Sequence, residues 1–172
     1  MDFFQIVEER RSMRKYADKP VEEAKLIRIL EAADRAPSGG NLQAYEIYFV
    51  RKLKTRQALV NAALGQSFLA EAPVVLVFCA NPPRSAVKYG ERGGSLYTIQ
   101  DATIACAYAQ LAAKAQGLDT VWVGAFDEAA VSEILHLPVE QRPIAMLPIG
   151  YAGREPGTRP RRGIKDLVHE MK

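Results

Sequence analysis

Apolar and polar positions follow two different periods along the chain, which predicts a protein that mixes helices with strands. Apolar residues recur at helical spacing in several segments, and helices are expected over 2–9, 20–36, 54–63, 95–116 and 128–135, with a short helix near the C-terminus. Runs rich in β-branched and aromatic residues predict strands over 45–52, 73–80, 120–126 and 142–152. This order of elements favours an α+β fold or a three-layer α/β/α sandwich.

Three segments carry more specific information. The run PVVLVFCA over 73–80 is continuously apolar, which is typical of a strand buried on both faces. The helix over 95–116 is rich in alanine and apolar nearly all round, so we expect it to pack closely on several sides and to end at Gly117. The polar segment 81–94 contains Pro and Gly and is predicted to be a loop with a functional role.

Composition narrows the class of protein. The 172 residues suit one domain spanning 1–172, with 48% hydrophobic and 25% charged residues. The formal charge of +3, from 23 basic and 20 acidic residues, is too balanced for bulk nucleic-acid binding, so any basic site must be local. Acidic residues stand where a signal peptide would be basic, and polar residues interrupt the longest apolar stretch, 96–115. A cytoplasmic protein without a membrane span is therefore expected.

The cysteines and histidines indicate no metal or redox chemistry of their own. Cys79 and Cys106 each lie inside an apolar run, which is typical of small buried side chains. Neither has a metal-ligand spacing to His136 or His169, so no metal site is predicted. The sequence also lacks a Walker A loop, a GxGxxG fingerprint, a nucleophile elbow and an HExxH helix.

The segment EERRSMRKY, residues 8–16, concentrates four cations around Ser12, namely Arg10, Arg11, Arg14 and Lys15. If the segment is extended, Arg10, Ser12 and Arg14 project to one side. They would form a cradle suited to a phosphate, because arginine donates hydrogen bonds in a planar fork. Arg11 and Lys15 can then point away from that side. A solvated basic face is the alternative, and the segment by itself leaves both interpretations open.

The segment APSGGNLQ, residues 36–43, is a second candidate site. Its Pro, Ser and Gly residues predict a tight loop whose backbone approaches a planar ligand closely. Asn41 and Gln43 carry donors and acceptors suited to the edge of a heteroaromatic ring, unless Asn41 serves only to bond the local backbone of a turn. Gly124 is a third candidate, because a glycine inside a strand often marks the approach of a ligand or another backbone. A second basic group, RPRR, stands at 159–162.

Together these motifs, in this order, resemble the nitroreductase family of flavoproteins. The matching features are RRSMR near the N-terminus, APSGGNLQ after the first main helix, GLDTVWVGAF after the alanine-rich helix, and LPIGY followed by a C-terminal arginine. The resemblance spans about residue 5 to residue 168. It implies a three-layer α/β/α sandwich with a mixed, largely antiparallel sheet, and an intertwined homodimer with FMN sites across its interface.

The resemblance also implies roles for individual residues. Contacts to the FMN phosphate are expected from Arg10, Ser12, Arg14 and Arg161. Contacts to the isoalloxazine, typically from the partner protomer, are expected from Pro37, Ser38, Gly39 and Asn41. The turn near flavin N5 and O4 is expected at Gly124 and Ala125, and further candidate contacts are Arg11, Gln43 and Gln66.

Two features depart from the family's pattern. Ala44 and Tyr45 stand where many members have Pro-Trp, and the insertions that often cover the flavin are largely absent. Part of the segment predicted to be a loop, residues 88–94, is expected to take over some of that covering. The candidate substrate contacts are Tyr89, Arg92 and Phe126.

The chemistry implied by the resemblance is hydride transfer from NADH or NADPH to flavin N5, then to a nitroaromatic, quinone or similar acceptor in ping-pong order. It requires no catalytic side chain. An N–H near Ala125 would bond N5, and Arg14 or Lys15 would stabilise the reduced flavin. Three alternatives stay open: other redox chemistry on the same fold (dehalogenation, flavin fragmentation or azoline oxidation), a flavin-binding module without turnover, and a basic protein that binds acidic partners.

Overall fold

The computed structural model describes residues 1–171, and its helices and strands alternate much as the hydrophobic pattern predicts. In chain order the elements are α1 (Phe3–Glu9), α2 (Glu23–Asp34), η1 (Gly39–Asn41), β1 (Tyr45–Val50), α3 (Leu53–Ala62), α4 (Phe68–Glu71), β2 (Val74–Ala80), α5 (Pro82–Arg92), η2 (Gly93–Tyr97), α6 (Thr98–Ala115), β3 (Asp119–Thr120), α7 (Glu128–Leu135), β4 (Arg142–Gly150) and α8 (Ile164–Leu167).

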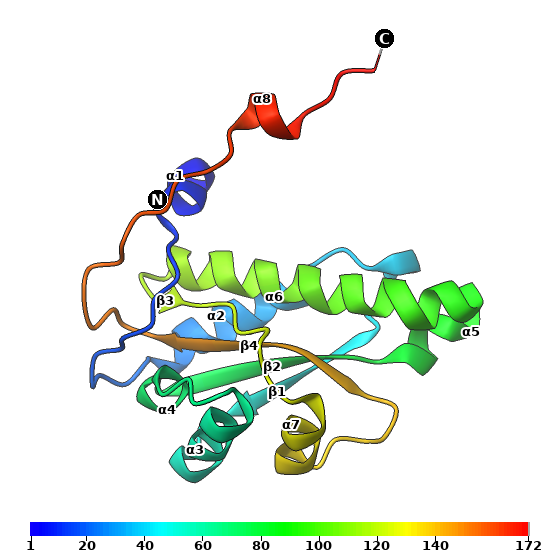
Figure 1. Cartoon of the computed structure of the whole chain (residues 1–172), viewed down its shortest axis with the longest axis horizontal. Coiled ribbons are helices and arrows are strands. Elements are labelled where there is room, and N and C mark those ends of the chain that lie inside the picture. Colours follow the sequence, from blue (N-terminus) through cyan, green and yellow to red (C-terminus); the bar gives the residue numbers. More distant parts are fainter. Residues whose placement is uncertain (172) are drawn as a thin grey trace.

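Within residues 1–171, four strands form one sheet in the order β1-β2-β4-β3. Every neighbouring pair is antiparallel, and a parallel bridge between Ser12 and Thr120 extends the β3 edge. Helices α2 and α6 cover one face of the sheet, whereas α3, α4 and α7 cover the other (Figure 1). The expected α+β sandwich is therefore confirmed, with a more uniformly antiparallel sheet than expected.

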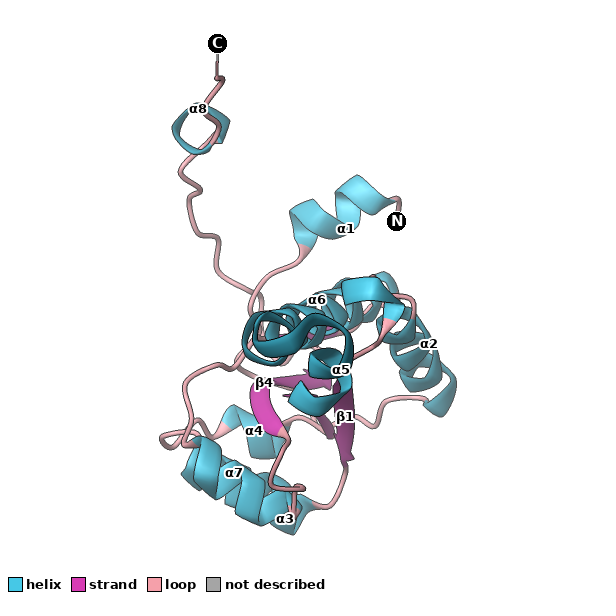
Figure 2. Ribbon diagram, turned by 90° about the vertical axis from the view of Figure 1, so that its right-hand side faces the viewer, coloured by secondary structure: helices cyan, strands magenta, loops and turns pink. Residues whose placement is uncertain are grey.

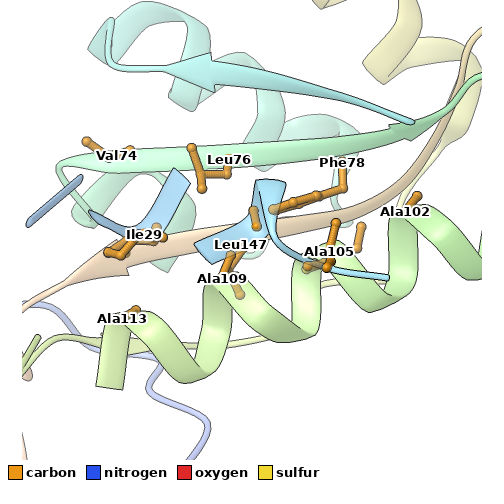
Figure 3. Close-up of a cluster of buried hydrophobic side chains, with 14 of the residues drawn as sticks. Ile29, Val74, Leu76, Phe78, Ala102, Ala105, Ala109, Ala113 and Leu147 are labelled. Atoms are coloured by element: carbon orange, nitrogen blue, oxygen red, sulfur yellow. The ribbon is translucent and has the colours of Figure 1, made fainter. Parts of the chain in front are cut away.

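The central strand β2 separates two hydrophobic cores. All seven of its residues are buried, as the continuous apolar run predicts. Because side chains alternate along a strand, Leu76 and Phe78 point toward α6 (Figure 3). Val75 and Val77 pack on the α3 side. Burial of each such large side chain stabilises the fold by about 1.5–3 kcal/mol.

Helix α6 packs close to the sheet because its inward positions are small. Ala102, Ala105, Ala109 and Ala113 have no exposed surface and lie against β2 and β4 (Figure 3). The helix ends as predicted at Gly117, whose φ of +73° is the left-handed conformation that glycine adopts readily. None of the helices within residues 1–171 combines the length and the apolar character that crossing a membrane requires.

The strand predicted over 120–126 is wrong in its extent, because β3 ends at Thr120 and pairing resumes only as an isolated bridge between Val123 and Met146. The same register would place Val121 opposite Pro148. Proline has no N–H to donate to the ladder. The Pro148 carbonyl instead accepts a hydrogen bond from the Tyr16 hydroxyl at 3.1 Å.

The loop predicted over 81–94 is also wrong, because this segment forms α5 and the start of η2. Pro82 and Pro83 open the helix, where their missing N–H groups cost no hydrogen bond. Gly90, with φ of +56°, kinks it, and Gly93 lies so close to the Ser85 backbone that a side chain there would collide. Proline and glycine therefore shape a helix here rather than exclude one. Helix α2 likewise begins at Glu23 rather than at Pro20.

The two ends of the chain stand away from the sandwich. Helices α1 and α8 project from the same side of the body in both views (Figures 1 and 2). Apolar side chains in these two end segments are exposed, including Phe4 at 80%, Val168 at 64% and Met171 at 90%. We refer to residues 1–12 and 154–171 as the two arms.

Candidate functional site

A basic pocket of about 570 Å³ lies where the two arms meet. Its lining residues are Val7, Glu8, Arg10, Arg11, Ser12, Arg14, Arg154, Gly157, Arg159 and Arg161. The structure thus brings together the four residues predicted to bind a phosphate, Arg10, Ser12, Arg14 and Arg161, and it adds Arg11, which was predicted only as a further candidate contact. Arg154 and Arg159 join them from the C-terminal arm.

The segment that carries these side chains is anchored by alternate burial. Met13 and Tyr16 are buried in the body, at 1% and 5% exposure, so Ser12 and Arg14 turn outward. The Met13 N–H donates to the Thr120 carbonyl at 2.9 Å, which adds this segment to the β3 edge. The Gly153 N–H donates to the Lys15 carbonyl at 2.8 Å, which holds the start of the C-terminal arm beside it.

The charges in the pocket are not balanced by acids. Within residues 1–171, no ion pair involves Arg10, Arg14, Arg154 or Arg161, and Glu8 is the acid that lines the pocket. Burial lowers the pKa of Arg10, and the neighbouring cations Arg161 and Arg11 lower it further. Like charges so close together are stabilised by a bound anion, and arginine forks fit the oxygens of a phosphate.

Two other cations of the same segment, Arg11 and Lys15, already bond groups of the protein. The Arg11 guanidinium donates to the backbone carbonyls of Glu8 and Arg10, although the side chain still lines the pocket. The Lys15 ammonium pairs with Glu71 at 3.2 Å. Of the two residues considered for stabilising a reduced ring, Arg14 therefore lies in the pocket and Lys15 is engaged outside it.

The loop 37–43 is held by the first turns of α6. The Asp101 carboxylate is 2% exposed and accepts hydrogen bonds from the Gly39 N–H at 2.8 Å and the Ala44 N–H at 3.4 Å. The Ser38 hydroxyl accepts from the Gln43 N–H at 3.0 Å. These bonds support a backbone with positive φ at Gly40, Asn41 and Gln43, namely 57°, 58° and 43°.

A second cleft, of about 510 Å³, lies beside this loop. It is lined by Pro37, Ser38, Gly39, Tyr97, Gln100, Asp101, Thr103 and Ile104. Three of the predicted ring contacts, Pro37, Ser38 and Gly39, therefore open onto one cleft. Asn41 is exposed, and its side-chain oxygen accepts from the Gln43 amide at 2.7 Å.

The predicted substrate residues lie in two places. The Tyr89 ring stands edge-on to Tyr97 with centroids 5.2 Å apart, and the Arg92 Nε donates to the Tyr97 hydroxyl at 3.2 Å, so both residues contact Tyr97, which lines the second cleft. Phe126 instead packs, partly buried, against the core on the α3 side of the sheet. It lies away from Tyr89 and Arg92, on the segment that follows β3.

The turn predicted to lie near the flavin N5 is exposed at both Gly124 and Ala125. The Gln66 side-chain amide donates to the Ala125 carbonyl at 3.1 Å, so the structure brings these two predicted residues together. The same amide donates to the Ala63 carbonyl at 3.0 Å. Gln66 thereby fixes the turn to the end of α3.

The basic pocket and the second cleft lie near opposite ends of α6. The cleft adjoins Tyr97 and Asp101 at the N-terminal end, whereas Ser12 bridges Thr120, just past the C-terminal end (Figure 1). With 18 residues, α6 is about 27 Å long. One protomer therefore keeps the two predicted halves of the site apart.

The sequence analysis does not identify several residues that shape the candidate site. Asp101 was read only as an interruption of an apolar stretch, and nothing in the sequence pairs it with a loop so far away along the chain. Thr98 also supports the loop's end, donating to the Ala44 carbonyl at 2.7 Å. The basic group at 159–162 was a usable signal for Arg159. Arg154 had no such signal. Cys79 and Cys106 are both buried, as predicted for small apolar side chains, and burial raises the pKa of the Cys79 thiol to about 12.

Comparison with known proteins agrees with this geometry. The sequence model of the family described as "Nitroreductase family" matches residues 7–67 and 61–151 of this chain. A Thermus thermophilus protein named NADH dehydrogenase is 34% identical over 173 residues, covering 85% of this chain and 84% of its own. The FMN reductase [NAD(P)H] of Bacillus subtilis is 31% identical over 173 residues, covering 93% and 70%. The structure of NADPH:FMN oxidoreductase from Vibrio harveyi complexed with NAD+ aligns with a TM-score of 0.90 at 26% identity, covering 99% and 77%.

The chain belongs to the nitroreductase family. The resemblance seen in the motifs is confirmed, and so is the enzyme class, an oxidoreductase of this family. An oxygen-insensitive NADPH nitroreductase of Salmonella typhimurium is also similar, at 30% identity over 167 residues, with 93% of this chain and 70% of that protein covered.

Proposed function

We propose that this chain is an FMN-dependent oxidoreductase that uses NADH or NADPH to reduce small acceptors such as nitroaromatics and quinones. The observation that carries the proposal is the basic pocket, in which clustered arginines lack acidic partners within residues 1–171. Burial, and then the nearby charges of Arg161 and Arg11, lower the pKa of Arg10, and a flavin phosphate would offset this repulsion. When bound, FMN supplies the redox chemistry, taking a hydride from the nicotinamide and passing electrons to the acceptor in ping-pong order.

The protein's own residues would bind and orient the cofactor. Arg10, Arg14 and Arg161 would hold the phosphate with Ser12, because their side chains line the pocket. Gly124 and Ala125 would offer backbone N–H groups to the ring, supported by Gln66. Arg14 would supply the positive charge that stabilises a reduced, anionic ring.

The separation of the two half-sites supports a homodimer. A single FMN is shorter than α6, so the cleft of one protomer and its own basic pocket would not serve the same flavin. A twofold axis that pairs two α6 helices in opposite directions would place the cleft loop of one protomer near the arginines of its partner. The α6 surface supports this, since Tyr108 is 41% exposed and Ile104 and Leu111 are partly exposed on its outer side.

Spectroscopy of the purified protein tests the proposal. We expect a yellow protein with flavin absorbance, release of FMN on denaturation, and bleaching by NADH or NADPH under anaerobic conditions. Adding a nitroaromatic or a quinone should then restore the oxidised spectrum. A colourless protein that FMN does not reconstitute would overturn the proposal. Bound flavin that neither nicotinamide reduces would favour a binding module without turnover.

A further inference from the structure

Helix α5 carries a group of cations whose role neither the fold nor the flavin explains. Arg84, Lys88 and Arg92 recur at intervals of four residues, with Glu91 as the acid of the helix. Within residues 1–171, none of these three cations forms an ion pair. We call them the α5 cations.

Two of the α5 cations, Arg84 and Arg92, are held by contacts to the cleft loop and to Tyr97. The Arg84 Nε donates to the Leu42 carbonyl at 2.6 Å, at the end of the cleft loop. The Arg92 guanidinium lies over the Tyr97 ring, 5.5 Å from its centroid, and Tyr97 lines the cleft. These contacts use one N–H of each guanidinium and leave the other donors available.

Lys88 comes closest to the loop itself. A side chain at Gly40 would approach the Lys88 ammonium to 2.8 Å and would collide with the Tyr89 hydroxyl. The glycine therefore makes room for both groups against the loop backbone. Lys88 is exposed, and within residues 1–171 its ammonium has no hydrogen-bond partner, only the face of Tyr89 at 5.2 Å.

The acid nearest to the cleft does not neutralise these cations. Asp101 is buried, and its two oxygens accept the N–H groups of Gly39 and Ala44. The cleft therefore combines an aromatic wall at Tyr97 with a cationic border and a carboxylate that is turned toward the backbone. Such a border attracts an aromatic molecule that carries a negative group, because the ring finds an apolar surface and the anion finds unpaired donors.

We propose that the α5 cations form a specificity site for the anionic group of the electron acceptor, so that the enzyme prefers aromatic acceptors bearing a carboxylate or sulfonate to neutral ones. The inference rests on the proposed function, because it assigns the substrate class of that same site. Lys88 and Arg92 are the specificity residues, and Arg84 also holds the loop.

A matched pair of acceptors tests the proposal. The holoenzyme is assayed with 4-nitrobenzoate and with neutral 4-nitrobenzamide at fixed NADH. In K88Q, and separately in R92Q, kcat/KM for 4-nitrobenzoate should fall about fivefold, as for a partly exposed charge interaction, whereas kcat/KM for 4-nitrobenzamide stays within about twofold. Added salt should reduce the wild-type preference for the benzoate. K88R should restore it.

The control is K54Q, which removes an exposed lysine on α3, across the sheet from the cleft. It should leave both acceptors unchanged. Equal losses for the two acceptors in K88Q and R92Q, or no loss for either, would overturn the proposal. Slower flavin reduction by NADPH but not by NADH in these variants would assign the cations to the donor's phosphate and overturn the assignment to the acceptor.

Stopped-flow reduction of the wild-type flavin separates this inference from the proposed function. If the nicotinamides do not reduce the bound flavin, the proposed function fails. If they reduce it and the variants show no selectivity for charge, only the anion site fails.

Discussion

The sandwich and the two arms differ in how their apolar side chains are buried and in how their charges are paired. In the sandwich, helices of the same chain cover both faces of the sheet, and β2 is buried along its whole length. In the arms, apolar side chains such as Phe4 and Val168 face outward, and the pocket arginines Arg10, Arg154, Arg159 and Arg161 form no ion pair within residues 1–171. The sandwich buries most of its large apolar side chains, whereas the arms leave most of theirs exposed, so we expect FMN and a partner protomer to complete the arms.

This difference separates stability from function. Packing of side chains between the sheet and its helices accounts for the body, and a change there should act on folding first. The arms contribute little packing to that body, so a change there should act on ligand binding or on assembly. The following predictions test this division.

The largest effect is expected in the core. Phe78 is fully buried between β2 and α6, and Phe78→Ala should lower the free energy of unfolding by about 3–5 kcal/mol, because it removes buried apolar area and leaves a cavity. Chemical denaturation at fixed protein and FMN concentrations measures it. As the control, Val139→Ala at a fully exposed position should change the value by less than about 0.5 kcal/mol. Similar losses in both variants would contradict the division.

The next effect concerns the flavin. Replacing Arg10 and Arg14 together with alanine should weaken FMN binding by about 3 kcal/mol, or roughly a hundredfold in Kd, because two charged contacts to the phosphate are lost. Titration of the apoprotein by flavin fluorescence measures Kd. The matched control is the double replacement of the exposed Lys52 and Lys54. Unchanged FMN affinity would contradict the phosphate-binding role and support the alternative, in which the basic cluster is a solvated face.

The smallest effect concerns assembly. Leu167 and Val168 are 55% and 64% exposed in one protomer, and replacing both with serine should raise the dimer dissociation constant by about tenfold if the partner covers them. Sedimentation equilibrium measures the dissociation constant. Val139→Ser, which alters an exposed apolar residue on the connection between α7 and β4, should leave it unchanged. An unaffected dimer would show that the C-terminal arm has another use.

Much of the fold could be predicted from local patterns. The apolar run at 73–80 required a strand buried on both faces, and the alanine-rich segment ending at Gly117 required a closely packed helix. The two larger errors have physical causes that lie in packing between segments. Pro148 interrupts the β3 ladder from another strand, and Gly93 lets the start of η2 pack closely on the Ser85 backbone of α5.

The candidate site, like the fold, could be predicted from the sequence only in part. The sequence by itself determined the family through the order of its motifs, and it identified the arginines and the glycine-rich loop, because those residue types carry their chemistry locally. Only the tertiary structure decided that Lys15 pairs with Glu71 whereas Arg14 lines the pocket, and that Asp101 holds the loop. It also decided that Arg92 of α5 lies over Tyr97, which lines the second cleft. Such pairings arise from packing between segments far apart in the chain, which no local pattern records.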